Sequence, residues 1–275
     1  MGSRPEQSEA CKAPPPSYGQ RTQQLINGQD LGFTPTITVD GPWTVEKVVE
    51  QLPGGAPAAG SSSPLAFFHM LERLKTTKRE GWRRFGIERG ESIADHMYRM
   101  SLISMFAPPS LAPRLDLPKC VKMCLVHDMA ELLVGDITPV DGVPKPEKSR
   151  REAATMDYLV SLAPSSVGAE IRAIWQEYED AQTLDSKFVH DVDKMELLLQ
   201  MMEYERRGAR GVDLGEFAYV AGNMTLEETR GWARELIAER EAFWGGEAHV
   251  QGDKGKEGGL SELHAKQQAE YYKRD

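Results

Sequence analysis

Cysteine is scarce in this 275-residue chain, which holds only Cys11, Cys120 and Cys124. Three cysteines are an odd and sparse set, so a disulfide-stapled secreted scaffold is excluded. No run of about 20 apolar residues could cross a bilayer, and the first residues lack the basic-then-apolar layout of a secretory signal. We therefore expect a protein of a reducing compartment, in the cytoplasm or also in the nucleus, that does not associate with a membrane.

Positive charge is also in short supply, because 33 Lys plus Arg stand against 42 Asp plus Glu and give a formal net charge of −9. A surface of that sign repels phosphate polymers, so we expect no nucleic-acid polymer as a partner. Hydrophobic residues make up 40% and charged residues 27% of the chain. These values are ordinary for a globular protein and exclude a wholly disordered chain.

Proline is unevenly distributed: nine of the 17 prolines fall before residue 65, together with the Gly-Ala-Ser run of residues 54–63. This composition is typical of flexible segments, so we expect residues 1–63 to form a mostly flexible arm. Residues 43–52 are an exception, because four apolar residues at i, i+3, i+4 and i+7 indicate a short helix that could dock on the main body. Residues 245–275, rich in Gly, Lys, Glu and Gln, are expected to form a charged polar tail.

The remaining residues, 64–244, suit one domain in length, and nearly every segment of them has helical periodicity. Ser92 followed three residues later by Asp95 resembles a capping box that opens a helix. Asp116 begins another helix, which we expect to continue as far as Gly135. Strand-like alternation occurs only at residues 36–39, so we predict an all-α fold.

Charged groups interrupt this last helix where apolar residues are expected. His127, Asp128 and Glu131 stand close together in Cys124-Leu-Val-His-Asp-Met-Ala-Glu131. Burying an imidazole and two carboxylates is costly unless they are paired or bind a cation. Imidazole nitrogen with carboxylate oxygen suits a catalytic divalent ion such as Mn, Co, Fe, Mg or Zn. This helix alone leaves a metal site and a satisfied polar network equally open.

Two further polar groups lie on apolar helical faces. His96 comes in the first turn of the helix that opens at Ser92, and Asp193 has apolar residues one turn before and one turn after it. Asp191 is nearly as well placed, and periodicity cannot choose between the two aspartates. Pairing of Asp193 with a neighbouring lysine is the alternative to a site.

The order His96, His127-Asp128, Asp193 resembles the H…HD…D motif of the HD-domain metal-dependent phosphohydrolases. The stretches Glu91-Ser-Ile-Ala-Asp-His-Met-Tyr-Arg-Met and Leu125-Val-His-Asp-Met-Ala-Glu-Leu-Leu-Val-Gly-Asp-Ile-Thr-Pro closely resemble the HD domain-containing 2 and bacterial 5'-deoxynucleotidase family. The similarity covers about residues 65 to 240. It implies an HD-domain helical bundle.

The resemblance also implies the metal ligands, which correspond to His96, His127, Asp128 and Asp193. The family match, and not the spacing, selects Asp193 over Asp191. Four protein ligands would leave a six-coordinate ion two open positions, one for water and one for a phosphate oxygen. Binding to a metal lowers the pKa of water from about 15.7 to as little as about 7.

Two acids complete the chemistry that the resemblance implies. Glu131, one turn beyond His127, is placed to orient the water or take its proton. Asp136 resembles the family's second catalytic acid, which could protonate the departing sugar oxygen. The alternative for Asp136 is a turn residue at a helix end.

Substrate phosphate needs cationic donors, and residues 75–89 hold a dense basic run. Arg79 with Trp82 resembles the family's phosphate-binding arginine and the tryptophan that disfavours a 2'-hydroxyl, although two residues separate them here. Lys148 and Arg151 could supply a second clamp. The alternatives are a solvated basic loop and, for Trp82, a place in the hydrophobic core.

We therefore predict a metal-dependent 5'-deoxynucleotidase that hydrolyses deoxyribonucleoside 5'-monophosphates with one divalent ion per subunit. A homodimer is implied by resemblance only. Other HD enzymes cleave cyclic nucleotides, guanosine tetraphosphate or dinucleoside polyphosphates, and these substrates stay as alternatives, as does a non-catalytic helical scaffold. Between residues 129 and 192 the sequence has only His190, which favours one metal over the two of histidine-richer relatives.

Overall fold

The computed structural model describes residues 31–57 and 63–245, and among these residues it contains helices and no strand. Extended backbone pairs there at one antiparallel bridge, between Lys78 and Ser92. The predicted all-α class is confirmed. Most of the expected arm and the expected tail lie outside the described residues. None of the described helices is long and apolar enough to span a bilayer.

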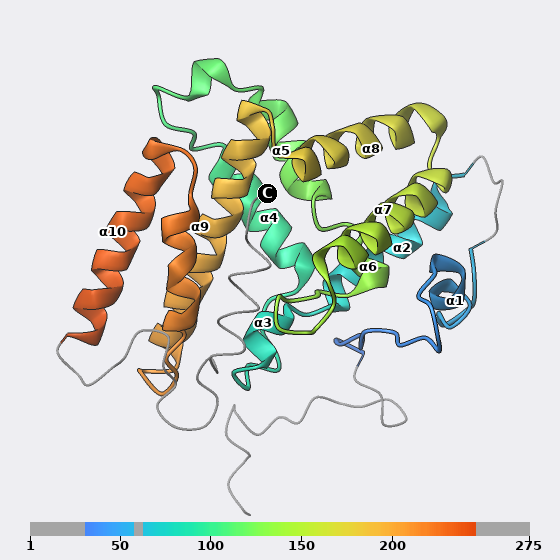
Figure 1. Ribbon diagram of the computed structural model, residues 1–275, viewed down its shortest axis with the longest axis horizontal. Helices are drawn as coiled ribbons and strands as arrows, with labels where there is room; N and C mark the ends of the chain where they lie inside the picture. Colours follow the sequence, from blue (N-terminus) through green and yellow to red (C-terminus); the bar gives the residue numbers. More distant parts are fainter. Residues whose placement is uncertain (1–30, 58–62, 246–275) are drawn as a thin grey trace, which may run out of the picture. The chain divides into compact units, whose positions relative to one another are not determined.

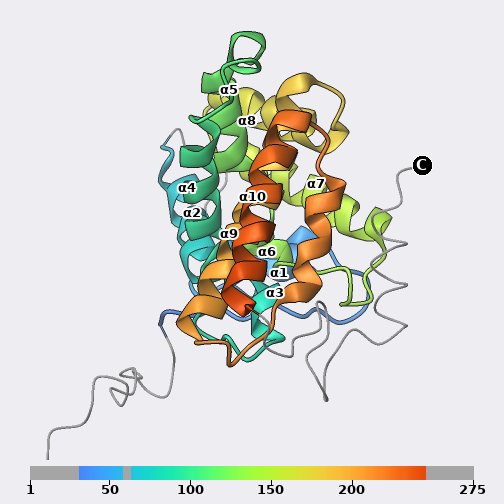
Figure 2. The ribbon, with the colours of Figure 1, turned by 90° about the vertical axis from the view of Figure 1, so that its left-hand side faces the viewer.

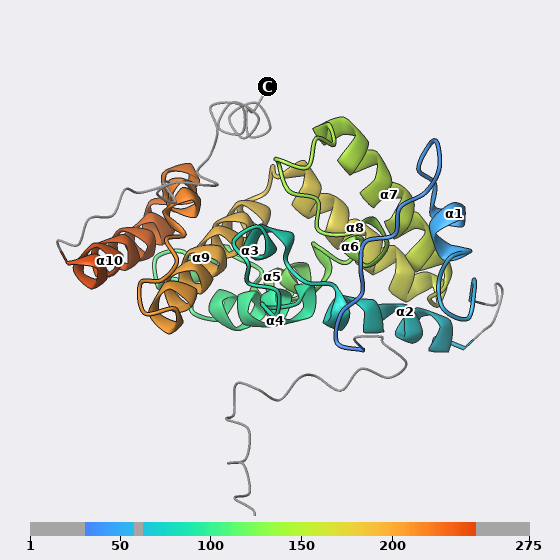
Figure 3. The same ribbon diagram turned by 90° about the horizontal axis from the view of Figure 1, so that it is seen from below.

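The longest described helix, α9, is the centre of the packing (Figure 1). It contacts α4, α5 and α8, and it also packs against α10 and the 3-10 helix η3. Figures 1 and 3 both show α10 beside α9. The elements in chain order are α1 Val45–Val49, α2 Leu65–Thr76, α3 Glu80–Arg83, α4 Ile93–Ser104, η2 Ala112–Arg114, α5 Leu117–Val126, α6 Glu131–Val134, α7 Lys145–Ser161, α8 Ser165–Asp180, α9 Leu184–Arg207, η3 Gly215–Asn223 and α10 Glu227–Trp244.

Two clusters of buried apolar side chains fill the helical body, and α9 contributes to both. Phe188 and Val192 lie in the first cluster, which α1, α2, α4, α5, α6, α7 and α8 complete. Leu198 and Met202 lie in the second, with side chains from η3 and α10. Because α9 is covered on several sides, its buried charged residues Asp191, Glu196 and Glu205 need partners within the protein.

The compact unit of the helical body begins at Phe33, so its packing includes part of the arm expected at residues 1–63. Helix α1 lies within residues 43–52, where Val48 and Val49 are buried against the first cluster, and it contacts α7 (Figure 3). Residues 36–39 form no strand.

Side-chain caps fix where the site-bearing helices begin. At α4 the expected capping box is present, since Asp95 N donates to Ser92 Oγ at 3.2 Å and Ser92 N donates to Asp95 Oδ2 at 2.8 Å. Asp116 caps α5 by accepting from Lys119 N at 3.1 Å, and Thr183 caps α9. These caps start each helix at a defined residue, so the polar groups further along keep a fixed direction.

The helix expected from Asp116 to Gly135 is not continuous, and that prediction was wrong. Helix α5 ends at Val126 and α6 begins at Glu131. In the intervening turn, backbone bonds span three residues, as between Glu131 N and the oxygen of Asp128 at 3.0 Å, and this tighter winding replaces the α-helical pattern. The break places the His-Asp pair at a helix end.

Candidate active site

His96 lies inside α4 with both ring nitrogens close to carboxylates. Its side chain is fully buried, and its Nδ1 is 2.5 Å from Oε2 of Glu196. The opposite nitrogen, Nε2, lies 3.1 Å from Oδ1 of Asp193 and 3.8 Å from Oδ2 of Asp128. The ring therefore joins α4 to α9 on one side and faces the turn after α5 on the other.

His127 caps the end of α5 and presents one nitrogen to the same point. Its Nδ1 lies 2.9 Å from the backbone oxygen of Cys124, which fixes the ring against its own helix. Its Nε2 lies 3.2 Å from Oδ2 of Asp128. Trp175 donates to the backbone oxygen of His127 at 3.1 Å, so α8 anchors the turn.

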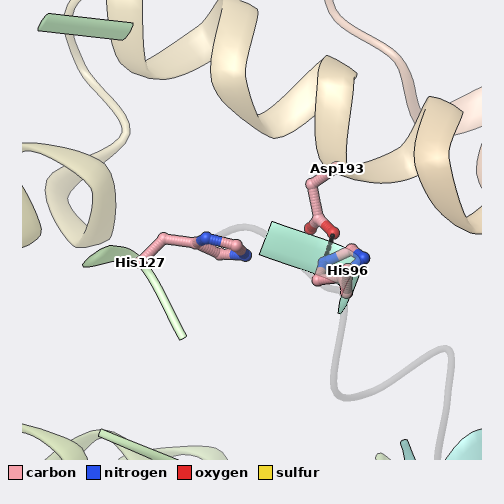
Figure 4. A group of neighbouring side chains, drawn as sticks. All are labelled: His96, His127 and Asp193. Atoms are coloured by element: carbon pink, nitrogen blue, oxygen red, sulfur yellow. Dashed lines mark ion pairs between the residues drawn. The ribbon is translucent and has the colours of Figure 1, made fainter. Parts of the chain in front are cut away.

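Ligand atoms of His96, His127 and Asp193 all lie within 4.8 Å of one another. Figure 4 shows His96 and Asp193 meeting in an ion pair, with the His127 ring directed toward them. Within the described residues, neither buried Nε2 has a hydrogen-bond partner, although each lies near a carboxylate. Atoms bound at about 2.1 Å to one ion with roughly right angles between them are about 3 Å apart. The cluster, with Asp128 beside it, therefore fits a divalent cation.

The structure distinguishes Asp191 from Asp193, between which helical periodicity could not choose a candidate ligand. Asp193 faces the histidines, and Tyr178 Oη donates to its other oxygen at 3.2 Å. Asp191 points elsewhere: its fully buried carboxylate accepts hydrogen bonds from the backbone and a side chain at the start of α10. This geometry favours Asp193 as the ligand.

The cluster holds opposite charges together. Burial and nearby Arg79 disfavour a charged imidazole at His96, but Glu196 and Asp193 outweigh both and hold the pKa of His96 well above its ordinary value. Burial likewise opposes ionisation of Asp193, yet His96 holds the pKa of this carboxyl well below its usual range. A cation among these groups would take the place of the imidazolium proton.

Arg79 stands among three of the site's acids. Its Nη1 lies 3.1 Å from Asp128 Oδ2, 3.6 Å from Asp136 Oδ1 and 3.9 Å from Glu131 Oε2. Asp136 also accepts a hydrogen bond from Glu80 N at 2.7 Å. Burial, with Asp128 and Asp136, raises the pKa of Glu131 well above its ordinary value, against the opposing charge of Arg79. The two candidate catalytic acids and the candidate phosphate ligand are therefore together.

The other candidate substrate residues lie at different distances from this cluster. Lys148, on α7, places its Nζ 3.6 Å from Glu131 Oε1 and so belongs to the site. Arg151 instead donates to Glu147 at 2.8 Å, and its guanidinium lies over the Trp43 ring, 5.6 Å from the centroid. The structure does not bring Arg151 to the acids.

Trp82 lies in the hydrophobic core, which was the alternative to a role in substrate binding. Its side chain is 1% exposed and packs against Tyr204 and Phe217 in the second cluster. The indole Nε1 donates to Glu91 Oε1 at 2.7 Å. A direct contact between Trp82 and a sugar stays a prediction.

Sequence reasoning did not find Glu196, which contacts His96, or Arg99, which contacts Glu196. Glu196 follows Asp193 by three residues on α9, and Arg99 follows His96 by three residues on α4. That spacing puts each on the same helical face as a candidate ligand. The signal was therefore present, as charged residues one turn beyond the ligands in apolar helices.

The sequence pattern of the HD domain family matches residues 71–230, more than half of the chain, and the protein therefore belongs to this family of metal-dependent phosphohydrolase folds. Among curated proteins, the chain is similar to the 5'-deoxynucleotidase hdd1 of Schizosaccharomyces pombe. The two are 44% identical over 191 residues, which cover 68% of this chain and 95% of that protein.

The human 5'-deoxynucleotidase HDDC2 is 39% identical over 182 residues, which cover 66% of this chain and 88% of the human protein. Among solved structures, the PH0347 protein of Pyrococcus horikoshii matches with a TM-score of 0.53 and 25% identity. That match covers 65% of this chain and 99% of the archaeal one.

Proposed function

We propose that this protein is a metal-dependent 5'-deoxynucleotidase, which hydrolyses deoxyribonucleoside 5'-monophosphates to deoxyribonucleosides and phosphate. The observation that carries the proposal is the convergence of two imidazoles and two carboxylates beside Arg79, Glu131 and Asp136. Membership of the HD domain family and the likeness to two proteins described as 5'-deoxynucleotidases support the reaction class.

His96, His127, Asp128 and Asp193 would hold one divalent ion per subunit. Two nitrogens and two carboxylate oxygens are donors that suit Mn, Co, Mg, Fe or Zn. When bound, such an ion supplies Lewis acidity toward the phosphoryl group and makes water a nucleophile near neutral pH. Elemental analysis of protein purified without added metal should find one such ion per subunit, and two equivalents would contradict the stoichiometry.

We assign Glu131 to the attacking water. Its Oε2 is buried and has no hydrogen-bond partner among the described residues, so it is free to accept a proton or orient the water. The raised pKa of Glu131 makes its carboxylate a stronger base, and Lys148 beside Oε1 keeps a counter-charge close.

We assign Asp136 to the leaving group. The hydrogen bond from Glu80 N fixes Oδ2, and Oδ1 is turned toward Arg79. An acid held there could give its proton to the departing sugar oxygen, so that the deoxyribonucleoside leaves as an alcohol.

Arg79 is our proposed phosphate ligand, and Lys148 is its partner. The Arg79 side chain lies among acids and is 14% exposed, so a phosphate oxygen could reach its guanidinium from solvent. We keep Arg151 as a weaker candidate, because it would have to leave Glu147. Trp82 is proposed to favour deoxyribose, and equal hydrolysis of ribonucleotides by the wild type would contradict that role.

We also propose a homodimer that uses one face of α4. Tyr98, Leu102 and Met105 follow one another at i, i+4 and i+7, and with Phe106 they are 40% to 75% exposed. Helix α4 lies beside α2 (Figure 2). Light scattering should give twice the chain mass, Phe106→Glu should give the chain mass, and the control Val167→Glu, at an exposed site on α8, should not change the mass.

The compartment that we propose is the cytoplasm, with the nucleus as a second location. Its support is the sparse cysteine content and the burial of Cys120 and Cys124, which form no disulfide within the described residues. Cell fractionation tests this assignment, and recovery from a secreted or vesicular fraction would contradict it.

One assay tests the reaction. Protein reconstituted with Mn²⁺ or Co²⁺ is incubated separately with deoxyribonucleoside 5'-monophosphates, ribonucleoside 5'-monophosphates, a cyclic nucleotide and guanosine tetraphosphate, and the products are measured. We expect phosphate release from the deoxyribonucleotides, and Asp193→Asn is the inactive control. Turnover of another class alone would identify a different HD enzyme, and no turnover of any class would favour the scaffold.

A further inference from the structure

We infer that Glu196, held in place by Arg99, is a positioning residue that orients His96 toward the cation. The inference rests on the metal site of the proposed function, but it does not depend on the substrate. It starts from one contact, the 2.5 Å distance between His96 Nδ1 and Glu196 Oε2.

This contact determines which His96 nitrogen can bind a metal. A carboxylate can only accept, so Nδ1 keeps its hydrogen, and Nε2 is the nitrogen whose lone pair is available to a metal once the ring is neutral. Nε2 is the atom that faces Asp193 and Asp128. Both members of the contact are buried, with side-chain exposures of 0% for His96 and 1% for Glu196, so water does not compete for the bond.

Arg99 holds the other oxygen of the same carboxylate. Its Nε donates to Glu196 Oε1 at 2.8 Å, and its Nη2 lies 2.6 Å from the same oxygen, so both contacts hold the oxygen that does not face His96. The same guanidinium donates to Gln200 and Glu203, each at 2.8 Å. Arg99 therefore ties α4 to about two turns of α9, and among these partners Glu196 is the one that contacts His96.

The two histidines differ in what orients them. His127 uses a backbone oxygen of its own helix, which no side-chain substitution can remove. His96 uses an anionic side chain from another helix, which also makes the ring a stronger donor to a metal. Loss of such a partner typically weakens metal binding by about 10- to 100-fold. Of the groups that orient the two histidines, only Glu196 can therefore be substituted, and its substitution should change the metal affinity.

The test is a Co²⁺ titration of metal-free protein, followed by visible absorption. Glu196→Gln should raise the Kd for Co²⁺ by about 10- to 100-fold and shift the absorption bands, because a neutral amide is a weaker acceptor for Nδ1 and cannot accept from both His96 and Arg99. The matched control is Glu203→Gln, which removes another partner of Arg99 that does not contact His96, and it should leave both Kd and spectrum unchanged. Saturating Co²⁺ should restore most of the kcat of Glu196→Gln.

A Kd within twofold of wild type in folded Glu196→Gln would overturn the inference, as would an equal effect of Glu203→Gln. If Glu196→Gln does not fold, Arg99→Gln decides: it should raise the Kd in the same direction, and an unchanged Kd and spectrum overturn the inference. Because Co²⁺ binding is measured without substrate, failure of the deoxynucleotidase assay would leave this result intact.

Discussion

Asp191 should be needed for folding and not for metal binding. Its buried carboxylate accepts from Thr225 N, Leu226 N and Thr229 Oγ1 at 2.7 to 3.0 Å. In Asp191→Asn the negative charge is lost, and the NH2 group of the amide faces one of these donors, which is then left without an acceptor. A buried donor left without a partner costs about 1–3 kcal/mol, and charge-assisted bonds become weaker by about 1 kcal/mol each. We expect a loss of about 3 kcal/mol in unfolding free energy, or a Tm lower by roughly 10 °C.

Asp193→Asn should behave in the opposite way. The Asp193 side chain is 29% exposed, and its contact with Tyr178 can pass to an amide oxygen. Without metal the variant loses the ion pair with His96, so its Tm should fall, but by less than that of Asp191→Asn because the pair is partly exposed to solvent. A cation at 100 times its Kd stabilises the wild type by about 2.7 kcal/mol, and this gain should disappear in Asp193→Asn.

Differential scanning fluorimetry of wild type, Asp191→Asn and Asp193→Asn, each with and without Mn²⁺, measures both effects. The expected pattern is a low Tm that still responds to Mn²⁺ for Asp191→Asn, and a smaller loss of Tm with no response to Mn²⁺ for Asp193→Asn. The reverse pattern would refute our choice of the ligand and our account of Asp191.

Three further predictions follow from single residues. Glu131→Gln should keep the Mn²⁺-induced rise in Tm and lose turnover, and loss of the rise would make Glu131 a ligand. Burial lowers the pKa of His190 to about 4 from about 6.5 in the unfolded chain, so the unfolded state alone binds this proton between those values. Stability should therefore fall by up to about 3 kcal/mol as the pH drops from 6.5 to 4, with no such contribution above 6.5. Urea unfolding of His190→Gln should show a shallower decline, and parallel curves would contradict the shift. Gly135→Ala places a Cβ 2.6 Å from Thr36 Oγ1 at φ +81°, so its Tm should fall well below that of Gly142→Ala, where φ is +73° and no atom lies within 4 Å of the added Cβ. Equal losses would mean that only the backbone angle matters.

Local signals gave much of the fold. The capping box at Ser92 and the stop at Gly135 depend on residues within one turn, and both are present in the structure. The break after Val126 was missed because apolar spacing continues through it, and only the change to three-residue backbone bonds marks it. Periodicity singled out His96 and His127 as polar groups on apolar helices, but only the resemblance joined them in one ligand set, since helical spacing cannot show which distant helices meet.

The charged residues of α9 show why the sequence could not reveal the role of each charge. Asp191 accepts hydrogen bonds at the start of α10, and Glu196 contacts His96 on α4. Glu205 accepts from Arg240 on α10 at 2.8 and 2.9 Å. Each of these partners is 34 or more residues away in sequence. Charged residues are frequent along α9, so the sequence does not show which of them are buried. A buried charge needs a partner, and only that partner shows whether the charge caps a helix, orients a ligand or stabilises the core.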